Sequence, residues 1–114
     1  MKTSYFGNKN VVADPAAVSI ARWSPKWWGS RRRYISLAPS PSLLGRSKAG
    51  LPWQAYVEEY KREVLDRLDP KEVYEELKDS IVMCWEKPGE KCHRRLVAEW
   101  IENAVSVTVI EFVG

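Results

Sequence analysis

The feature that most constrains the fold of this 114-residue chain is one continuous window in its C-terminal half. Residues 80–85, S-I-V-M-C-W, are nearly all apolar, which is typical of a central strand covered on both faces. A Pro-Gly turn follows at 88–89, and residues 91–103 then repeat apolar side chains at the three- and four-residue steps of an amphipathic helix. Residues 105–112 are β-branched with a two-residue period. Strand, helix and strand in this order predict a parallel crossover.

The preceding part of the chain continues this alternation of strands and helices. Residues 18–21 predict a short strand, and residues 33–37 predict a second one, which a Pro-Ser-Pro segment ends. Residues 52–68 follow a helical period, and Asp69 is predicted to cap a further helix that begins at Pro70.

Length and composition indicate a single folded domain. With 45% hydrophobic and 29% charged residues, a chain of 114 residues can bury one core but not two. The order of elements predicts an α/β domain over residues 1–114, with a small three- or four-stranded, mostly parallel sheet and helices packed on its faces. Residues 23–50 are expected to form a long basic and aromatic loop region.

The sequence carries no sign of export or of membrane insertion. The first ten residues include a lysine but no apolar segment of the signal-peptide type, and no apolar run approaches the roughly 20 residues of a membrane span. We therefore predict a cytoplasmic protein without membrane association. In that compartment the two cysteines are expected to be reduced thiols rather than a disulfide.

Charge is distributed unevenly along the chain. Residues 1–50 carry a net charge of +8 and residues 51–114 a net charge of −5. Cations interleaved with aromatic rings suit a polyanion, because cations hold phosphates while rings stack on bases. The candidate nucleic-acid-binding residues are Trp27, Trp28, Arg31, Arg32 and Arg33. The alternative is structural: the charges offset the acidic helices beside them, and the tryptophans fill a small core.

A candidate site lies where the predicted strands end and the 91–103 helix begins. Ligands of parallel α/β folds bind beyond the carboxyl ends of the strands, and helix N-termini attract anions. Cations in a first helical turn oppose the helix dipole, at about 0.3–1 kcal/mol each. A bound anion would offset them, which predicts an anion site formed by Arg94, Arg95 and Arg22. The alternative for Arg95 is a plain surface pair with Glu99.

The same window offers residues for catalysis. Cys92 at a helix N-terminus flanked by cations can form a reactive thiolate, His93 can exchange a proton near neutral pH, and Glu86 can act as a general acid or base. Alternatively, Cys92 and His93 are buried structural residues and Glu86 pairs with an arginine. A zinc site is not expected, because adjacent residues of one helical turn do not readily bind one ion together. A redox pair of Cys84 with Cys92 is permitted but not predicted. Without a P-loop or a Gly-x-Gly-x-x-Gly motif, we predict no cofactor.

The string C-W-E-K-P-G-E-K-C-H-R-R-L-V-A-E-W-I, at 84–101, resembles the signature of an uncharacterised family, domain of unknown function 488 (DUF488). Its members share a strand ending in Cys-x-Glu and a Cys-His-Arg at a helix start. Segments 20–29 and 34–40 also resemble that family, so the likeness covers most of residues 18–103. It implies a compact α/β fold and brings no established activity. It also implies that this chain lacks the N-terminal strand and helix of longer members, or replaces them with residues 3–14.

Three functional hypotheses follow from these observations. The leading one is an anion- or nucleotide-binding domain, with nucleic acid or a phosphate-bearing small molecule as partner and Cys92, His93 and Glu86 as candidate catalytic residues. The second is a non-catalytic nucleic-acid-binding module that uses the tryptophans and the Arg31–Arg33 run. The third is a protein-interaction module whose aromatic loop is the interface.

Overall fold

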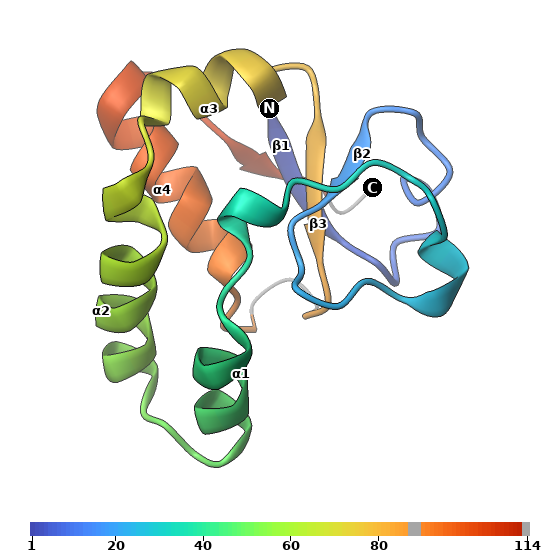
Figure 1. Cartoon of the computed structure of the whole chain (residues 1–114). Helices are drawn as coiled ribbons and strands as arrows, with labels where there is room; N and C mark the ends of the chain where they lie inside the picture. Colours follow the sequence, from blue (N-terminus) through green and yellow to red (C-terminus); the bar gives the residue numbers. More distant parts are fainter. Residues whose placement is uncertain (87–89, 113–114) are drawn as a thin grey trace.

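A computed structural model describes residues 1–86 and 90–112 of the chain (Figure 1). Its centre is a four-stranded sheet in the order β2-β3-β1-β4. The strands are β1 (Lys2–Tyr5), β2 (Ala17–Ser19), β3 (Ile81–Cys84) and β4 (Ile110–Glu111). All pairings among these four strands are parallel, which confirms the predicted α/β fold class.

The two faces of the sheet are covered by different kinds of structure. Along β3, Val82 and Cys84 belong to a core shared with the helices, while Ile81 and Met83 belong to a second core. This alternation follows from the two-residue period of a strand, and it explains why the whole strand is apolar and buried. In Figure 1 the helices lie on one side of the sheet and the loops on the other. The second core is closed by loop residues, with Trp28 only 1% exposed.

In the described part of the chain, four α-helices cover one face of the sheet. They are α1 (Pro41–Lys48), α2 (Trp53–Glu63), α3 (Pro70–Leu77) and α4 (His93–Val105). Helix α4 packs against the sheet, and α2 and α3 pack against α4 (Figure 1). The predicted cap of α3 is confirmed, since the Asp69 carboxylate accepts a hydrogen bond from the Lys71 backbone N–H at 2.9 Å. None of the helices in the described part of the chain has the length and apolar character to cross a bilayer.

Two elements were not predicted. Strand β1 is one of the two inner strands of the sheet, and it overlaps residues 3–14, which were one of the two alternatives raised for the N-terminal segment. Helix α1 lies within the region assigned to a long loop. Ser40 caps it by accepting a hydrogen bond from the Leu43 N–H at 3.0 Å, and Pro41 occupies its first turn.

Other boundaries differ from those predicted. The strand predicted at 33–37 is wrong: only an isolated bridge joins Arg33 to Ser19, and Ile35–Leu37 then form a 3-10 helix. The predicted strand 105–112 contracts to β4, because α4 continues through Val105 and ends at Ser106 in the left-handed conformation (φ 57°). The turn predicted at 88–89 lies outside the described residues.

Candidate functional site

A cavity of about 540 Å³ opens at the carboxyl ends of β2 and β3. Helices α1, α2 and the start of α4 complete its wall, so it lies at the edge of the sheet where parallel α/β folds bind ligands. Its charged lining residues are Arg22, Lys48, Glu86 and Lys91, and its aromatic ones are Trp23, Trp53, Tyr56 and Trp85. The cavity therefore combines three cations with one carboxylate and several aromatic faces.

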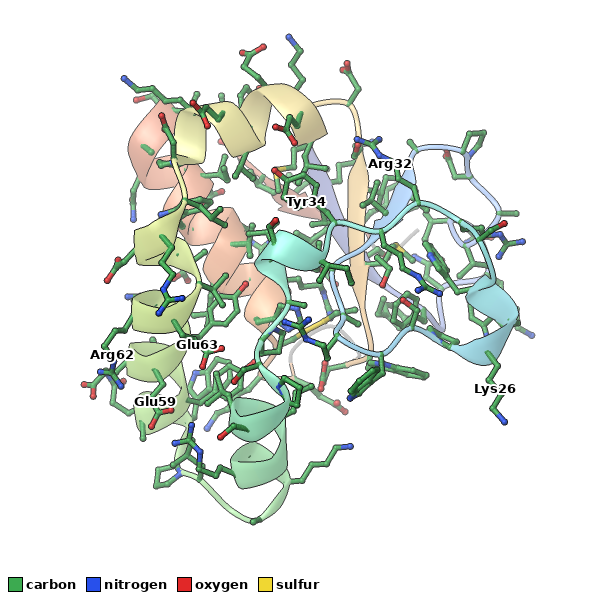
Figure 2. The ribbon with its side chains drawn as sticks, viewed as in Figure 1. Lys26, Arg32, Tyr34, Glu59, Arg62 and Glu63 are labelled. Carbon is green, nitrogen blue, oxygen red and sulfur yellow. A yellow bond between two sulfur atoms is a disulfide. The ribbon has the colours of Figure 1, made fainter. Side chains whose placement is uncertain are left out.

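The two cysteines meet at the floor of this cavity. Cys84 is the last residue of β3, and Cys92 immediately precedes α4. Both are buried, and they form a disulfide, visible as the yellow bond in Figure 2. The expectation of two reduced thiols is therefore wrong for this structure. It rested on the compartment predicted for the chain, whereas the strand–loop–helix connection brings both sulfur atoms to one place.

His93 lies beside this pair as the first residue of α4. Its Nε2 lies 2.9 Å from the Ile20 carbonyl oxygen, and its Nδ1 lies 3.8 Å from Cys92 Sγ. Since a carbonyl only accepts hydrogen bonds, Nε2 carries the proton and Nδ1 keeps a free electron pair directed at the sulfur. Burial, together with the nearby Arg94 charge, lowers the pKa of His93 to about 4, although the hydrogen bond to the Ile20 carbonyl acts in the opposite direction. The imidazole is therefore neutral at pH 7.

Glu86 and Trp85 follow β3 and form the rim of the cavity. Glu86 is partly buried, and its Oε2 lies 3.5 Å from Cys84 Sγ. Trp85 is 53% exposed, and its indole N–H donates to the Trp23 carbonyl at 2.8 Å. The structure thus brings the three candidate catalytic residues, Cys92, His93 and Glu86, to the wall of one cavity.

Arg94 has a partner within the fold. Its side chain is only 1% exposed and forms an ion pair with Glu111 of β4, with Nη2 and Oε2 2.8 Å apart. Its Nε also donates to both oxygens of Glu111, and its Nη1 donates to Cys84 Sγ at 3.2 Å. Burial opposes ionisation of Glu111, but hydrogen bonds from Arg94 and Thr3 hold the pKa of that carboxyl below its usual range.

Arg95, the next cation of α4, also turns toward the sheet. Arg95 Nη1 donates to the Thr3 hydroxyl at 2.8 Å and to the Val109 carbonyl at 3.1 Å. Glu111 was not identified from the sequence. The available signal was a single acidic residue in the apolar run that ends the chain, since a charge in such a run is expected to have a partner. The Glu111 carboxylate therefore pairs directly with Arg94 and is linked to Arg95 through the Thr3 hydroxyl.

Arg22 lies three residues beyond the end of β2 and lines the cavity. Its Nε donates to the Pro39 carbonyl at 2.9 Å and its Nη2 to the Ala38 carbonyl at 3.4 Å. These two bonds fix the guanidinium against the segment that leads into α1. A guanidinium has five donors, and within residues 1–86 and 90–112 these two carbonyls are the hydrogen-bond partners of Arg22, which leaves N–H groups for a ligand in the cavity.

The three arginines at 31–33 all make contacts within the fold. Arg31 lies over the Trp27 and Trp28 rings, with its guanidinium carbon 5.8 Å from each centroid. Arg32 donates to Ser80 Oγ and to the Glu76 carbonyl, and Arg33 donates to the Gly29 carbonyl. Figure 2 shows Arg32 beside the end of the sheet, whereas Lys26 projects away from the molecule.

The two candidate tryptophans of this loop differ in exposure. Trp28 is buried in the second core, and its indole N–H donates to the Arg32 carbonyl at 3.2 Å. Trp27 is 53% exposed and packs edgewise on Phe6. The structural alternative raised for the tryptophans therefore describes Trp28, while Trp27 keeps an accessible ring.

Fold and site together define a small parallel α/β domain with a mixed cationic and aromatic cavity at the carboxyl ends of its strands. The chain belongs to the DUF488 family: a family model described as the active DUF488-N3 subclade matches residues 12–105. The resemblance drawn from the 84–101 string is thereby confirmed. No curated protein and no solved structure matches the chain.

Proposed function

We propose that the cavity binds a phosphate-bearing small molecule, such as a nucleotide, and that it is the active site of an enzyme. The observation that carries the proposal is the composition of the wall, where Arg22, Lys48 and Lys91 face the same space as Trp23, Trp53 and Trp85. Cations match the charge of a phosphate and aromatic faces match a base. The volume of about 540 Å³ suits a ligand of nucleotide size.

The anion site is proposed at the cavity cations rather than at the two arginines at the start of α4. Arg94 already has a carboxylate partner in Glu111, and Arg95 donates to Thr3 and Val109. A phosphate beside Arg94 would compete with that carboxylate. Arg22, together with the two lysines, is therefore the cation that we assign to the phosphate.

Catalysis is proposed for the reduced form of the site. Reduction frees the Cys92 thiol at the start of α4, where the helix dipole favours the thiolate, and Arg94 Nη1 supports negative charge on Cys84 at 3.2 Å. Glu86 at the rim can exchange a proton with a bound ligand. The description of the matched subclade as active is consistent with an enzyme.

Replacing Arg22 by glutamine is expected to weaken nucleotide binding about tenfold, because a hydrogen bond to a charged group contributes about 1.5–3 kcal/mol. The probes are nucleoside monophosphates and inorganic phosphate, and the measurements are calorimetric titration and quenching of tryptophan fluorescence. Arg62→Gln, on the exposed side of α2 (Figure 2), is the matched control and should leave the affinity unchanged. Failure of every nucleotide to bind, or equal binding by both variants, would overturn the proposal.

A second candidate function, binding of single-stranded nucleic acid, is favoured by the exposed tryptophans. Trp23 and Trp85 stand at the cavity rim with 63% and 53% of their surface exposed. Phe6 connects Trp85 to Trp27, with ring centroids 5.1 Å and 6.2 Å away respectively. The buried Phe6 ring thus links two exposed rings, Trp85 at the cavity and Trp27 in the basic loop.

Trp27→Ala is expected to weaken binding of a fluorescent oligothymidine about tenfold, since one stacked base contributes about 1–3 kcal/mol. Trp27→Phe keeps an aromatic face and should retain most of the affinity. Fluorescence anisotropy at two salt concentrations measures both variants, and native binding should fall steeply with salt. If Trp27→Ala bound the oligothymidine as tightly as Trp27→Phe, an aromatic face at position 27 would not contribute to the interface.

A further inference from the structure

We propose that the reduced protein binds one zinc ion at the floor of the cavity, through Cys84 Sγ, Cys92 Sγ and His93 Nδ1. The ligand atoms of these three residues all lie within 4.8 Å of one another, and all three residues are buried. Two thiolates and an imidazole are a common ligand set for Zn²⁺. The proposal does not rest on nucleotide binding, because it uses only the three side chains and their surroundings.

The orientation of His93 is that of a metal ligand. Histidines that bind a metal through one ring nitrogen usually donate the other N–H to a carboxylate or a backbone carbonyl. Here Nε2 donates to the Ile20 carbonyl at 2.9 Å, which fixes the ring and leaves Nδ1 as the electron-pair donor. The acceptor lies one residue beyond β2, so the sheet itself positions the imidazole.

The backbone at Cys92 removes the objection that adjacent residues cannot bind one ion. That objection assumed that both residues belong to a helical turn. Cys92 instead has an extended backbone, with φ −148° and ψ 145°, and helical geometry begins at His93. Cys92 Sγ and His93 Nδ1 therefore lie 3.8 Å apart on the same side of the chain. Tetrahedral zinc with the usual bond lengths separates a sulfur from a nitrogen by about 3.6 Å.

The spacing of the two cysteines also suits an ion between them. Their Cα atoms are 7.5 Å apart, beyond the range of about 4.4–6.8 Å that is usual for disulfides. On one tetrahedral zinc the two sulfurs would be about 3.8 Å apart instead of about 2.0 Å, so a metal bridge spans a wider backbone gap.

The surroundings provide charge balance and a fourth coordination position. Arg94 donates to Cys84 Sγ and is itself neutralised by Glu111, so it supports the thiolate without leaving an unpaired charge. Glu86, whose Oε2 lies 3.5 Å from Cys84 Sγ, is the carboxylate placed to fill the fourth position from the cavity side. With Glu86 bound, four protein ligands would close the site as in structural zinc sites, whereas a fourth position left open to the cavity is typical of catalytic ones.

Metal binding requires reduction of the disulfide. A dithiol reductant supplies two electrons, the S–S bond breaks, each sulfur takes up one proton, and the reductant becomes a disulfide. When zinc binds, both thiols release their protons as the two Zn–S bonds form. The disulfide and the metal-bound forms are therefore mutually exclusive states of the same pair of cysteines, and the free Cys92 thiolate proposed for catalysis belongs to a third state that is reduced and metal-free.

The test uses the full chain after reduction with a phosphine and removal of metals, titrated with Co²⁺ and then with Zn²⁺. We expect one Co²⁺ per chain, with the intense visible bands of tetrahedral cobalt and a thiolate-to-cobalt charge-transfer band. Zn²⁺ should bleach both, and the disulfide form should show neither. Absence of these bands in the reduced native chain would overturn the proposal without any variant being made.

Single-residue variants distinguish this site from nonspecific binding of Co²⁺ by the thiols. Cys84→Ser and His93→Gln are each expected to weaken Co²⁺ binding at least tenfold and to change the spectrum, whereas Arg62→Gln should not. Circular dichroism reports whether the variants are folded. Thiolate bands that persist unchanged in His93→Gln would exclude the histidine and thereby the proposed ligand set. Titration with nucleoside monophosphate in chelator tests the nucleotide proposal separately, since it excludes the metal.

Discussion

Replacing Glu111 by leucine is expected to lower the free energy of unfolding by about 3–5 kcal/mol, because it leaves a buried guanidinium without its counter-ion. Arg94 is 1% exposed and directs both Nε and Nη2 at the Glu111 carboxylate. The same carboxylate accepts a hydrogen bond from the Thr3 hydroxyl, and that hydroxyl also accepts one from Arg95. One substitution therefore removes the acceptor that connects α4, β1 and β4. Urea unfolding followed by tryptophan fluorescence measures the loss.

Two further variants give the interpretation its controls. Glu59→Gln breaks the ion pair of Glu59 with Arg46, whose side chains are 24% and 46% exposed, and should cost far less stability than Glu111→Leu, because solvent screens an exposed pair. Arg94→Met combined with Glu111→Leu removes both charges and should recover most of the stability lost by Glu111→Leu alone. A loss below 1 kcal/mol for Glu111→Leu, or a double variant no more stable than it, would contradict the assigned role of the pair.

The strand–loop–helix at the centre of the site could be predicted because its signal is local. The consecutive apolar positions 81–84 are explained by a strand with a core on each face, and the helix after it has a clear apolar side. Both patterns are visible in the sequence because residues close together in each segment pack against the same cores. Their positions in the structure, Ile81–Cys84 and His93–Val105, agree with those predicted to within two residues.

Strand β1 was missed because its burial depends on distant partners. Its sequence, K-T-S-Y, is polar, yet Thr3 and Ser4 are fully buried. Their hydroxyls donate to the Glu111 side chain and the Phe112 carbonyl, which lie 108 positions further along the chain. A polar side chain is buried without penalty only where such a partner is supplied, and a local pattern does not contain that information.

The cations at the start of α4 were predicted to need negative charge nearby, and the structure supplies part of it from within the fold. A basic first turn does need negative charge nearby, since the helix dipole gives it none. The sequence pointed to a bound anion, while the structure gives Arg94 a carboxylate from β4. The anion site at Arg94, Arg95 and Arg22 stays a prediction, and of these three residues Arg22 lines the cavity.

Burial of the single histidine should make stability depend on pH in a defined window. The pKa of His93 is lowered from 6.5 to about 4, so the folded state holds the ring neutral where the unfolded state takes up a proton. Stability is therefore unaffected by this group above pH 6.5, falls as the pH drops from there to about 4, and levels off below that. A pKa shift of this size lowers the free energy of unfolding by about 3 kcal/mol at pH 4.

Two measurements on the disulfide form, in chelator so that no metal competes, can check this expectation. Because His93 is the only histidine of the chain, its ring proton resonance is unambiguous, and its titration midpoint in the folded protein should lie near pH 4. Urea unfolding should show stability falling already between pH 6.5 and 5, before most carboxylates titrate. His93→Gln should lack this component while keeping the losses at lower pH. A midpoint near 6.5 would mean that the ring reaches solvent, and the fixed imidazole on which the zinc site depends would then be excluded.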